Sequence, residues 1–384
     1  MGACLGELRP VRVAGIGLHR YQPASEATFV TLGLTAVRAA LADAGVAWNA
    51  VEAAYTGTAL LGFAPGRTML RYLGATGIPM VQVENASASG STAFRMACLD
   101  VATGVSDIAI AIGVDKPAPF RFAPAAAGLR DLVGSRILPV THFALLADEY
   151  MHRYGVKPEQ LAQVAVKNHR NGARNPFAHR RKERTLEDVM AGPALAGVLT
   201  RLQCCPIGEG ASAAIVVSDE AIRRLGIDRA RSVRVLSSVL ASERVYPGAA
   251  NWDAELTAET AGRALREARV APADLDVIEV HDAFSIEEPL YLEAMGVCRA
   301  GEAAHLLAEG AWDIGGRCAV SPSGGLLAMG HPIGPTGVGQ VAEIVRQLRG
   351  EAGVRQQPRA RVGLAHMVGV GAVCAVHVLA REED

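Results

Sequence analysis

The sequence predicts an α/β protein made of two similar halves, and three observations support this. The chain has 384 residues, of which 50% are hydrophobic and 20% charged. This composition excludes a disordered chain, and the length suits two packed domains. Continuous apolar runs of strand length alternate with longer amphipathic stretches, the pattern of strands buried on both faces between helices. The third observation is an internal repeat.

The repeat consists of a helix, a short turn and a strand. The pattern Ala-Leu-x-x-Ala-x-Val-Ala occupies residues 40–47 and returns at residues 264–271. An apolar stretch follows each copy and ends at Gly57 in the first half and at Asp282 in the second. A strand-like run also precedes each copy, at residues 11–16 and 233–239. Because the register is kept across several elements, we expect a duplicated α/β unit.

The other elements agree with a duplication. Residues 107–113 and 211–218 are continuous apolar runs that predict buried strands. Residues 89–103 begin with small side chains and predict a helix, and residues 338–348 predict its counterpart in the second half.

Between the halves lies a long insertion of different character, residues 117–205. It contains loops rich in Pro and Ala, a helix around residues 143–154 and two basic stretches. An insertion of this length in a compact fold is usually functional. We therefore predict an N-terminal half of residues 1–230, which includes the insertion, and a C-terminal half of residues 231–384.

Charge and cysteine content restrict the partners and the compartment. With 38 basic against 39 acidic residues, the net charge is −1, which gives no electrostatic basis for binding nucleic acid or an anionic membrane. The apolar run at residues 367–380 is too short for a membrane span, and no signal peptide precedes the first strand. Seven cysteines without paired zinc spacing predict no metal site and a reducing, cytoplasmic location.

Four segments contain candidate catalytic residues. The first, around Ser87, places small residues and a serine where a strand runs into a helix, so that backbone N–H groups would favour a developing anion. The alternative is that its serines cap the helix. The second surrounds His331 in a glycine-rich stretch that is longer than an ordinary turn and predicts a close backbone approach to a ligand.

The third and fourth segments contain one histidine each. His281 stands at the carboxyl end of the repeated strand, where catalytic groups gather in open α/β sheets, although Asp282 beside it could simply cap a helix. His366 precedes a glycine-rich turn that contains Gly369 and Gly371, and here a buried structural histidine is a fair alternative.

Together these segments resemble the thiolase family, and in particular the sterol-carrier-protein-type thiolases, over nearly the whole chain. The resemblance rests on a set of motifs in order: Asn168-His169-x-Asn171, Asp188-Val-Met190, Leu202-Gln-Cys-Cys-Pro206, Val277-Ile-Glu-Val-His-Asp-Ala-Phe284, Pro322-Ser-Gly-Gly325, Gly330-His-Pro332 and Gln347-Leu-Arg-Gly-Glu-Ala-Gly353. It implies the thiolase fold, with duplicated halves in a five-layer α-β-α-β-α body, two five-stranded sheets and the insertion as a lid.

The resemblance also implies roles for the candidate residues. Ser87 occupies the position of the nucleophilic cysteine that an acyl-CoA acylates, and His331 would activate it and help to hold the thioester oxygen. His281 replaces an asparagine that orients a water in an oxyanion hole. His366 would take the proton from the α-carbon of the second CoA ester, and the turn near Gly369 would supply an amide to a second oxyanion hole beside the Ser87 amide.

Substrate-binding residues are expected in the insertion. His142 and Phe143 match residues that line the pantetheine and acyl pocket. Arg180 and Arg181 lie in a basic stretch that, by resemblance, covers the CoA arm, where arginine forks suit the nucleotide phosphates. The alternative for these arginines is a solvated helix end.

Two positions depart from the family pattern. Relatives usually have asparagine where Met367 stands, so the turn after His366 is expected to pack differently. Relatives use cysteine at position 87, and a serine hydroxyl is far less acidic than a thiol and needs a well-aligned base. Ser87 is therefore a Cys→Ser change, a natural serine variant, or part of a lyase that forms no covalent acyl-enzyme.

The resemblance implies an acyltransferase that makes or breaks a carbon–carbon bond in CoA thioesters, by 3-oxoacyl-CoA thiolysis or by the reverse condensation. The alternatives are a retro-aldolase on a 3-hydroxyacyl-CoA and a non-catalytic subunit of a thiolase-like complex. Coenzyme A is a substrate, and no metal or redox cofactor is implied. A homodimer or a dimer of dimers is expected, and a small OB-fold/zinc-ribbon subunit is an additional partner in similar chains.

Overall fold

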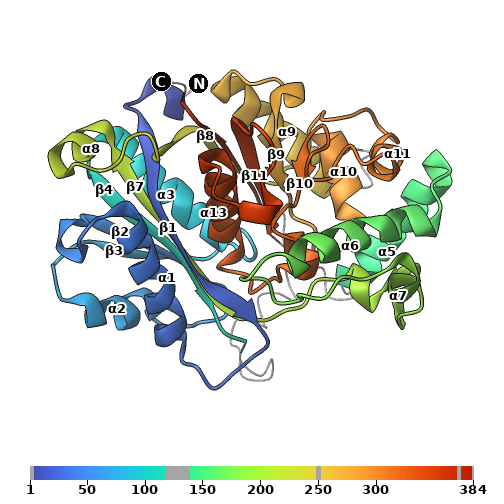
Figure 1. Ribbon diagram of the computed structural model, residues 1–384, viewed down its shortest axis with the longest axis horizontal. Helices are drawn as coiled ribbons and strands as arrows, with labels where there is room; N and C mark the ends of the chain where they lie inside the picture. The colour runs from blue at the N-terminus through green and yellow to red at the C-terminus, as the bar shows by residue number, and fades with distance from the viewer. Residues whose placement is uncertain (1–3, 118–138, 248–251, 370–372, 383–384) are drawn as a thin grey trace.

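The computed structural model describes residues 4–117, 139–247, 252–369 and 373–382. Helices and strands form five layers. A helical layer lies between two five-stranded parts, which pairing joins into one ten-stranded sheet rather than the two separate sheets expected, and a further helical layer lies outside each part (Figure 1). This confirms the predicted α/β fold of five layers. The division into residues 1–230 and 231–384 stays a prediction.

The first half forms one five-stranded part of the sheet. In spatial order its strands are β1 (Val11–Gln22), β7 (Glu209–Ser218), β4 (Ile108–Asp115), β2 (Ala53–Gly57) and β3 (Met80–Val83). β2 runs parallel to both β4 and β3, whereas β7 is antiparallel to β1 and β4. Every residue of β4 and β7 is buried, which agrees with the continuous apolar runs in their sequence.

The second half repeats this order. Its strands are β8 (Val233–Ser242), β12 (Val373–Ala380), β11 (Val362–Gly369), β9 (Val277–Glu279) and β10 (Ala319–Val320). β1 and β8 pair antiparallel at Arg12 with Arg234 and at Val13 with Val233, so the two parts form a continuous order of ten strands. The duplication read from the sequence is therefore present in the strand order.

The repeated unit itself has the predicted register. Helix α1 (Phe29–Ala44) is followed by a 3₁₀ turn and β2, and helix α9 (Trp252–Ala268) is followed by a 3₁₀ turn and β9. The Thr28 side chain caps α1 by accepting a hydrogen bond from the Thr31 N–H, and Gly45 ends the helix in the left-handed conformation. Local sequence signals thus account for where the first copy starts and stops.

The helical layers follow from the apolar faces of the helices. α1 and α8 (Asp219–Leu225) cover the outer face of the first sheet, and α9, α10 (Glu287–Ala294) and α11 (Ala303–Ala308) cover that of the second. The middle layer is made by α3 (Ser89–Thr103) and α13 (Thr336–Arg349), which contribute to one core cluster with both sheets (Figure 1). The two middle helices lie at equivalent places in the two halves.

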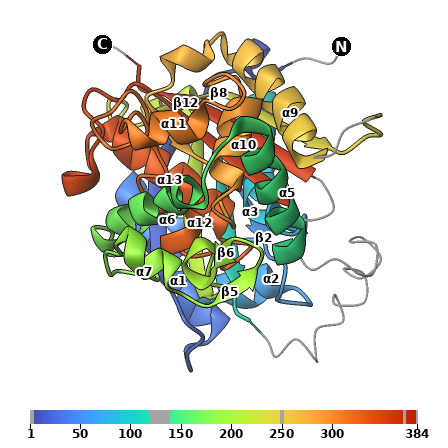
Figure 2. The same cartoon turned by 90° about the vertical axis from the view of Figure 1, so that its right-hand side faces the viewer.

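Short elements complete the body and the insertion. α2 (Pro65–Leu70) lies beside β3, and α12 (Gly325–Ala328) precedes α13. The insertion contributes α5 (Pro139–Tyr154), α6 (Pro158–Ala173), α7 (Leu186–Met190) and the small hairpin of β5 (Ala194–Ala196) and β6 (Leu199–Thr200). These elements lie together on one side of the molecule (Figure 2). The predicted loops at residues 118–138 fall outside the described residues.

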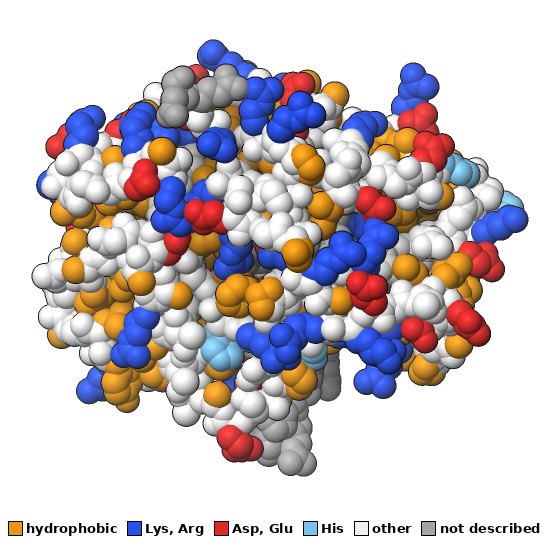
Figure 3. All heavy atoms as spheres, viewed as in Figure 1, with side chains coloured by type: hydrophobic (Ala, Val, Ile, Leu, Met, Phe, Trp, Pro, Cys, Tyr) orange, Lys and Arg blue, Asp and Glu red, His pale blue; other side chains and the backbone are white. Residues whose placement is uncertain are grey.

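The surface in Figure 3 shows basic and acidic side chains interspersed, as the near-zero net charge leads one to expect. Within the described part of the chain, none of the helices combines the length and apolarity needed to cross a bilayer.

Candidate active site

Ser87 lies in the tight turn that connects β3 to the N-terminus of α3. The preceding residue, Ala86, has a φ of 48°, a left-handed conformation that a non-glycine residue rarely adopts. Ser89 closes the turn, since its hydroxyl accepts from the Asn85 N–H and donates to the Ala86 carbonyl. Ser87 makes no such cap, because the N-cap position is Ala88 and carries no side-chain hydrogen bond. Ser87 is therefore free for another role.

The Ser87 hydroxyl contacts His331. The distance from Ser87 Oγ to His331 Nε2 is 2.9 Å, and both side chains are buried. On the other side of the ring, His331 Nδ1 lies 2.9 Å from Thr336 Oγ1 in the first turn of α13. Burial and the neighbouring His281 hold the pKa of His331 well below its usual range, so the ring is neutral. A neutral imidazole next to a serine hydroxyl can accept its proton.

The loop that carries His331 belongs to the second half and is fixed to the first half by hydrogen bonds. The His331 N–H donates to the Pro206 carbonyl at 3.0 Å, and the Gly334 N–H donates to Asp115 Oδ2 at 2.7 Å. Asp115, at the end of β4, also accepts from the Thr58 hydroxyl and the amide of Ala59. Burial raises the pKa of Asp115 to about 6. This carboxyl group links β4 of the first half to the His331 loop.

His281 lies directly after β9 and beside His331. The centroids of the two rings are 5.6 Å apart and the rings are nearly perpendicular. His281 Nδ1 lies 2.9 Å from Oε1 of Glu287, a buried carboxylate in the first turn of α10. The other nitrogen, Nε2, is buried and has no hydrogen-bond partner among the described residues.

His366, on β11, is fully buried, and both of its ring nitrogens have partners. Nε2 lies 3.0 Å from the Thr257 hydroxyl on α9, and Nδ1 accepts from the His281 backbone N–H at 3.4 Å. Its ring also packs against Tyr291, with 4.9 Å between the centroids. Burial lowers the pKa of His366 to about 3, with a smaller effect from His281. The ring thus faces the outer helices rather than the Ser87 turn.

The residues on either side of His366 in the strand face the other way. Met367 is fully buried and packs with Ala88, next to Ser87. At the end of the same strand, a side chain at Gly369 would come within 2.5 Å of the Asn85 carbonyl and 3.5 Å of the Ala88 amide. Gly369 therefore lies against the Ser87 turn, and its oxyanion role stays a prediction. Gly371 falls outside the described residues.

The predicted acyl-pocket residues lie near His281. Phe143, on α5, stacks on Phe284 with 4.8 Å between the ring centroids, and His142 forms an edge contact with Phe143. Burial lowers the pKa of His142, partly offset by the charge of Glu287, which places His142 within the field of that carboxylate. The insertion thus reaches the residues around His281.

The structure separates the two predicted arginines. Nη1 of Arg180 donates to the carbonyls of Cys204 and Leu327, at 2.9 and 3.0 Å, and burial lowers the pKa of Arg180. Arg181 is exposed. Both arginines were predicted to contact the CoA phosphates, with a solvated helix end as the alternative. Backbone carbonyls hold part of the Arg180 guanidinium, and the CoA contacts of both residues stay predictions.

Sequence reasoning missed three residues that support the site: Glu287, Asp115 and Thr336. Glu287 follows His281 in the sequence and starts α10 together with Glu288, so it resembles the ordinary acidic first turn of a helix. Asp115 ends an apolar run, the position after a strand where functional polar groups are common. Neither pattern tells which residues the carboxyl group contacts, and nothing in the sequence singles out Thr336.

Two family models match the chain. The model of the thiolase N-terminal domain matches residues 19–185, and the model described as thiolase C-terminal domain-like matches residues 242–381.

Curated relatives agree over nearly the whole chain. The benzoylsuccinyl-CoA thiolase subunit BbsB of Thauera aromatica is 36% identical over 373 residues, covering 94% of this chain and 95% of that protein. An acetyl-CoA acetyltransferase of Methanothermobacter thermautotrophicus is 35% identical, covering 97% of this chain and 100% of that protein. Sterol carrier protein 2 of Gallus gallus is also 35% identical, covering 97% of this chain and 72% of that protein.

Solved structures show the same fold at lower sequence identity. The structure of an Ltp2-ChsH2(DUF35) aldolase has a TM-score of 0.83 at 24% identity and covers 98% of each chain. Human mitochondrial 3-ketoacyl-CoA thiolase has a TM-score of 0.76 at 16% identity, covering 99% of this chain and 100% of that chain. The chain therefore belongs to the thiolase family and is an acyltransferase that makes or breaks carbon–carbon bonds in CoA thioesters.

Proposed function

We propose that Ser87 is the acyl-accepting nucleophile of this thiolase and that His331 is its base. The contact of 2.9 Å between Ser87 Oγ and His331 Nε2 carries the proposal. Ser87 Oγ attacks the thioester carbonyl of an acyl-CoA while its proton passes to Nε2, and the thiol of CoA leaves with that proton. A serine needs such an aligned base because its hydroxyl is far less acidic than a thiol.

The position of Ser87 supports stabilisation of the tetrahedral intermediate. The N-terminus of α3 follows directly, and the positive end of the helix dipole favours negative charge there. Gly369, which lies against this turn, is the proposed second contributor beside the Ser87 amide. A single oxyanion-hole donor is typically worth about 10²–10³ in rate.

The second half-reaction requires a base for the α-proton of the acceptor CoA ester. His366 was predicted for this role, but both its ring nitrogens are hydrogen bonded, and the assignment stays a prediction. His142 and Phe143 are proposed to line the acyl and pantetheine pocket, which their place beside Phe284 supports. CoA is the substrate, with no separate cofactor in the scheme.

Intact-mass spectrometry tests the nucleophile. After incubation with a panel that includes acetyl-CoA and benzoylsuccinyl-CoA and an acid quench, the wild-type chain should carry one acyl group. Ser87→Ala should carry none, and Ser87→Cys should acylate faster because a thiol ionises more readily. Ser91→Ala, one turn further along α3, is the matched control and should acylate like the wild type. An adduct on Ser87→Ala would refute the assignment.

Retro-aldol cleavage of a 3-hydroxyacyl-CoA is a second candidate. It is favoured by the serine at position 87 and by Nε2 of His281, which has no hydrogen-bond partner in the described part of the chain. Such a reaction needs a base for the 3-hydroxyl and no acyl-enzyme. Full carbon–carbon cleavage by Ser87→Ala would support this candidate. Loss of cleavage in that variant would support the acyl-transfer route.

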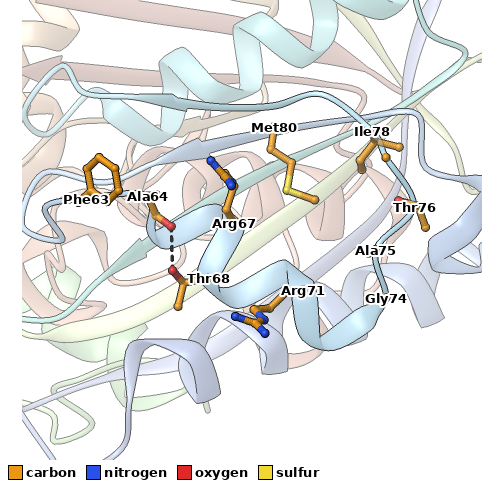
Figure 4. Close-up of a pocket in the computed structure, with 11 residues that line it drawn as sticks. Phe63, Ala64, Arg67, Thr68, Arg71, Gly74, Ala75, Thr76, Ile78 and Met80 are labelled. Atoms are coloured by element: carbon orange, nitrogen blue, oxygen red, sulfur yellow. Dashed lines mark hydrogen bonds between the residues drawn. The ribbon is translucent and has the colours of Figure 1, made fainter.

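A homodimer, or a dimer of such dimers, is the proposed assembly. β3 is the last strand of the sheet order, and Val81 on it is 42% exposed. Beside it, α2 and the chain leading into β3 line a pocket of about 730 Å³, with Phe63 at one end and Thr76 and Ile78 at the other (Figure 4). An unpaired edge with apolar side chains favours pairing with a second copy. Light scattering should show a dimer that Val81→Lys weakens.

A small OB-fold/zinc-ribbon subunit is a further proposed partner. One relative is itself named a thiolase subunit, and one structural neighbour is named as a pair of proteins, Ltp2-ChsH2. A cytoplasmic location is proposed as well, since all seven cysteines are free and a reducing compartment keeps thiols in that state.

A further inference from the structure

The two nitrogens of the His281 ring have very different surroundings. Nδ1 lies 2.9 Å from Glu287 Oε1, whereas Nε2 is buried without a partner among the described residues. Leaving a buried polar atom unpaired is unfavourable, so such an atom needs an explanation. A bound reactant in contact with Nε2 would explain why this atom is left without a partner in the protein.

Glu287 is held in place by three donors. Besides the His281 ring, the Tyr291 hydroxyl donates to Oε1 at 3.1 Å and the Phe284 N–H donates to Oε2 at 2.8 Å. Among the ion pairs of the described residues, its partner is His281 and neither a lysine nor an arginine. The next residue, Glu288, differs, since it pairs with Lys167.

This arrangement fixes the tautomer of His281. A carboxylate can only accept, so Nδ1 carries the hydrogen and Nε2 presents a lone pair. When Nε2 takes up a proton, the resulting imidazolium lies against the buried Glu287 carboxylate, which pairs with no lysine or arginine among the described residues. The same logic describes the aspartate–histidine pair of serine proteases, where the carboxylate orients the base and stabilises its charged form.

The surroundings of the His366 ring differ from those of His281. Its Nδ1 accepts from the His281 N–H, so Nε2 carries the hydrogen and donates to Thr257, and no lone pair is left to accept a proton. The charge of a protonated His281 also lowers the pKa of His366 and of His331. Of the three histidines, His281 is the one with a carboxylate to balance its charge.

We propose that His281 is the base that removes the α-proton of the second CoA ester, and that Glu287 is its positioning residue. This rests on the proposed acyl transfer through Ser87. The α-C–H bond breaks, its proton moves to His281 Nε2, and its electron pair forms the enolate of the thioester. The enolate carbon attacks the acyl group on Ser87, and the ester C–O bond breaks. The α-proton held by His281 then restores the Ser87 hydroxyl, because the proton that His331 took from Ser87 left with the first CoA thiol.

Two measurements separate the half-reactions. The rate at which α-hydrogens of the CoA ester exchange with solvent deuterium, followed by mass spectrometry, reports on the α-proton base. The burst of CoA release, followed with a thiol reagent, reports on acylation of Ser87. Glu287→Gln keeps the size of the side chain and removes its charge, so exchange should fall by about 10²–10⁴ while the burst stays near normal.

Three further variants test whether the loss of exchange is specific to the charge of Glu287. Glu287→Asp retains the charge and should recover part of the exchange rate. Tyr291→Phe removes a different hydrogen bond to the same Oε1 and should change exchange by less than about fivefold, far below the general-base effect. Thr257→Val removes the partner of His366 and should likewise leave exchange intact. Thermal melting of each variant checks that it is folded.

Exchange at the wild-type rate in Glu287→Gln, or loss of exchange in Thr257→Val alone, would overturn the proposal in favour of His366. If Glu287→Gln does not fold, His281→Asn serves as the same test, and retained exchange in it has the same meaning. Exchange without any burst of CoA in the wild type would refute the role of Ser87 and leave that of His281 standing.

Discussion

His331 and His366 remain neutral at pH values where an exposed histidine is charged, because burial lowers the pKa of both. An unperturbed histidine has a pKa of about 6.5, and such a value predicts that activity falls below that pH. Burial and His281 hold the pKa of His331 well below this range, so His331 is available as a base in more acidic solution. The protonation state of His331 is thus set by its surroundings.

We therefore expect the burst of CoA release to stay constant as the pH falls through about 6.5, the ordinary histidine pKa. This constancy follows from the lowered pKa of His331. Only the neutral ring accepts the Ser87 proton, and the ring stays neutral until the pH approaches that lowered pKa. Stopped-flow measurement of the burst in a series of buffers checks this. A burst that titrates with the ordinary histidine pKa would show that His331 is more exposed to water in solution.

The two neighbouring arginines predict opposite phenotypes. Arg181→Gln should raise the KM for CoA esters several-fold with little change in kcat, because Arg181 is exposed and its guanidinium suits phosphate. Arg180→Gln should instead lower the free energy of unfolding by about 1–3 kcal/mol, since the carbonyls of Cys204 and Leu327 lose their donor. Steady-state kinetics and urea unfolding distinguish the two. An unchanged KM in Arg181→Gln would remove it from the CoA site.

At the scale of elements, the site depends on how closely α3 and α13 approach. A side chain at Gly90, in the first turn of α3, would collide with the Gly334 carbonyl in the loop before α13. Glycine at this point lets the Ser87 turn and the His331 loop come together. The contact between Ser87 and His331 is therefore a consequence of helix packing as well as of the two loops.

Gly90→Ala should lower the free energy of unfolding by about 1–3 kcal/mol and slow acylation, because the rigid backbone of Gly334 must move away. Gly262→Ala in α9 is the matched control, since its added methyl meets only the flexible end of Arg266. Removing a glycine from a helix interior there should stabilise by about 0.5–1 kcal/mol. Urea unfolding measures both, and equal effects of the two changes would contradict the packing argument.

Contacts between elements of the two halves hold the molecule together. The middle helices contribute to a core cluster with strands of both halves, and β1 pairs with β8. The buried guanidinium of Arg12 forms ion pairs with Asp219 of the first half and Glu382 of the second. Each half alone would expose the apolar face that its middle helix buries against the other.

We expect calorimetry of the intact chain to show one cooperative unfolding transition. Separate chains of residues 1–230 and 231–384 should be poorly folded by circular dichroism, since each lacks half of the middle layer. Two resolved transitions, or a stable fragment, would mean that the halves are independent domains. Mixing the two fragments provides a further check, because recovered structure would show that the interface itself drives folding.

Much of this architecture was predictable because its signals are local. The resemblance to the thiolase family implied that Ser87, His281 and His331 act together. Apolar runs, helix periodicity and glycine-rich turns predicted the strands, the middle helices and the repeat. These signals lie within a few residues of one another, where backbone geometry and burial act directly. The internal repeat also supported these predictions, because elements found in one half predicted equivalent elements in the other.

The direction of His366 and the roles of Glu287 and Asp115 emerged only from the folded chain. β11 is buried on both faces, so its sequence has no alternation to tell which residues face the outer helices and which face Ser87. A shift of one residue would exchange His366 with Met367, and only pairing with β12 and β9 settles the choice. Glu287 and Asp115 likewise acquire their roles from contacts with distant loops, which tertiary packing alone creates.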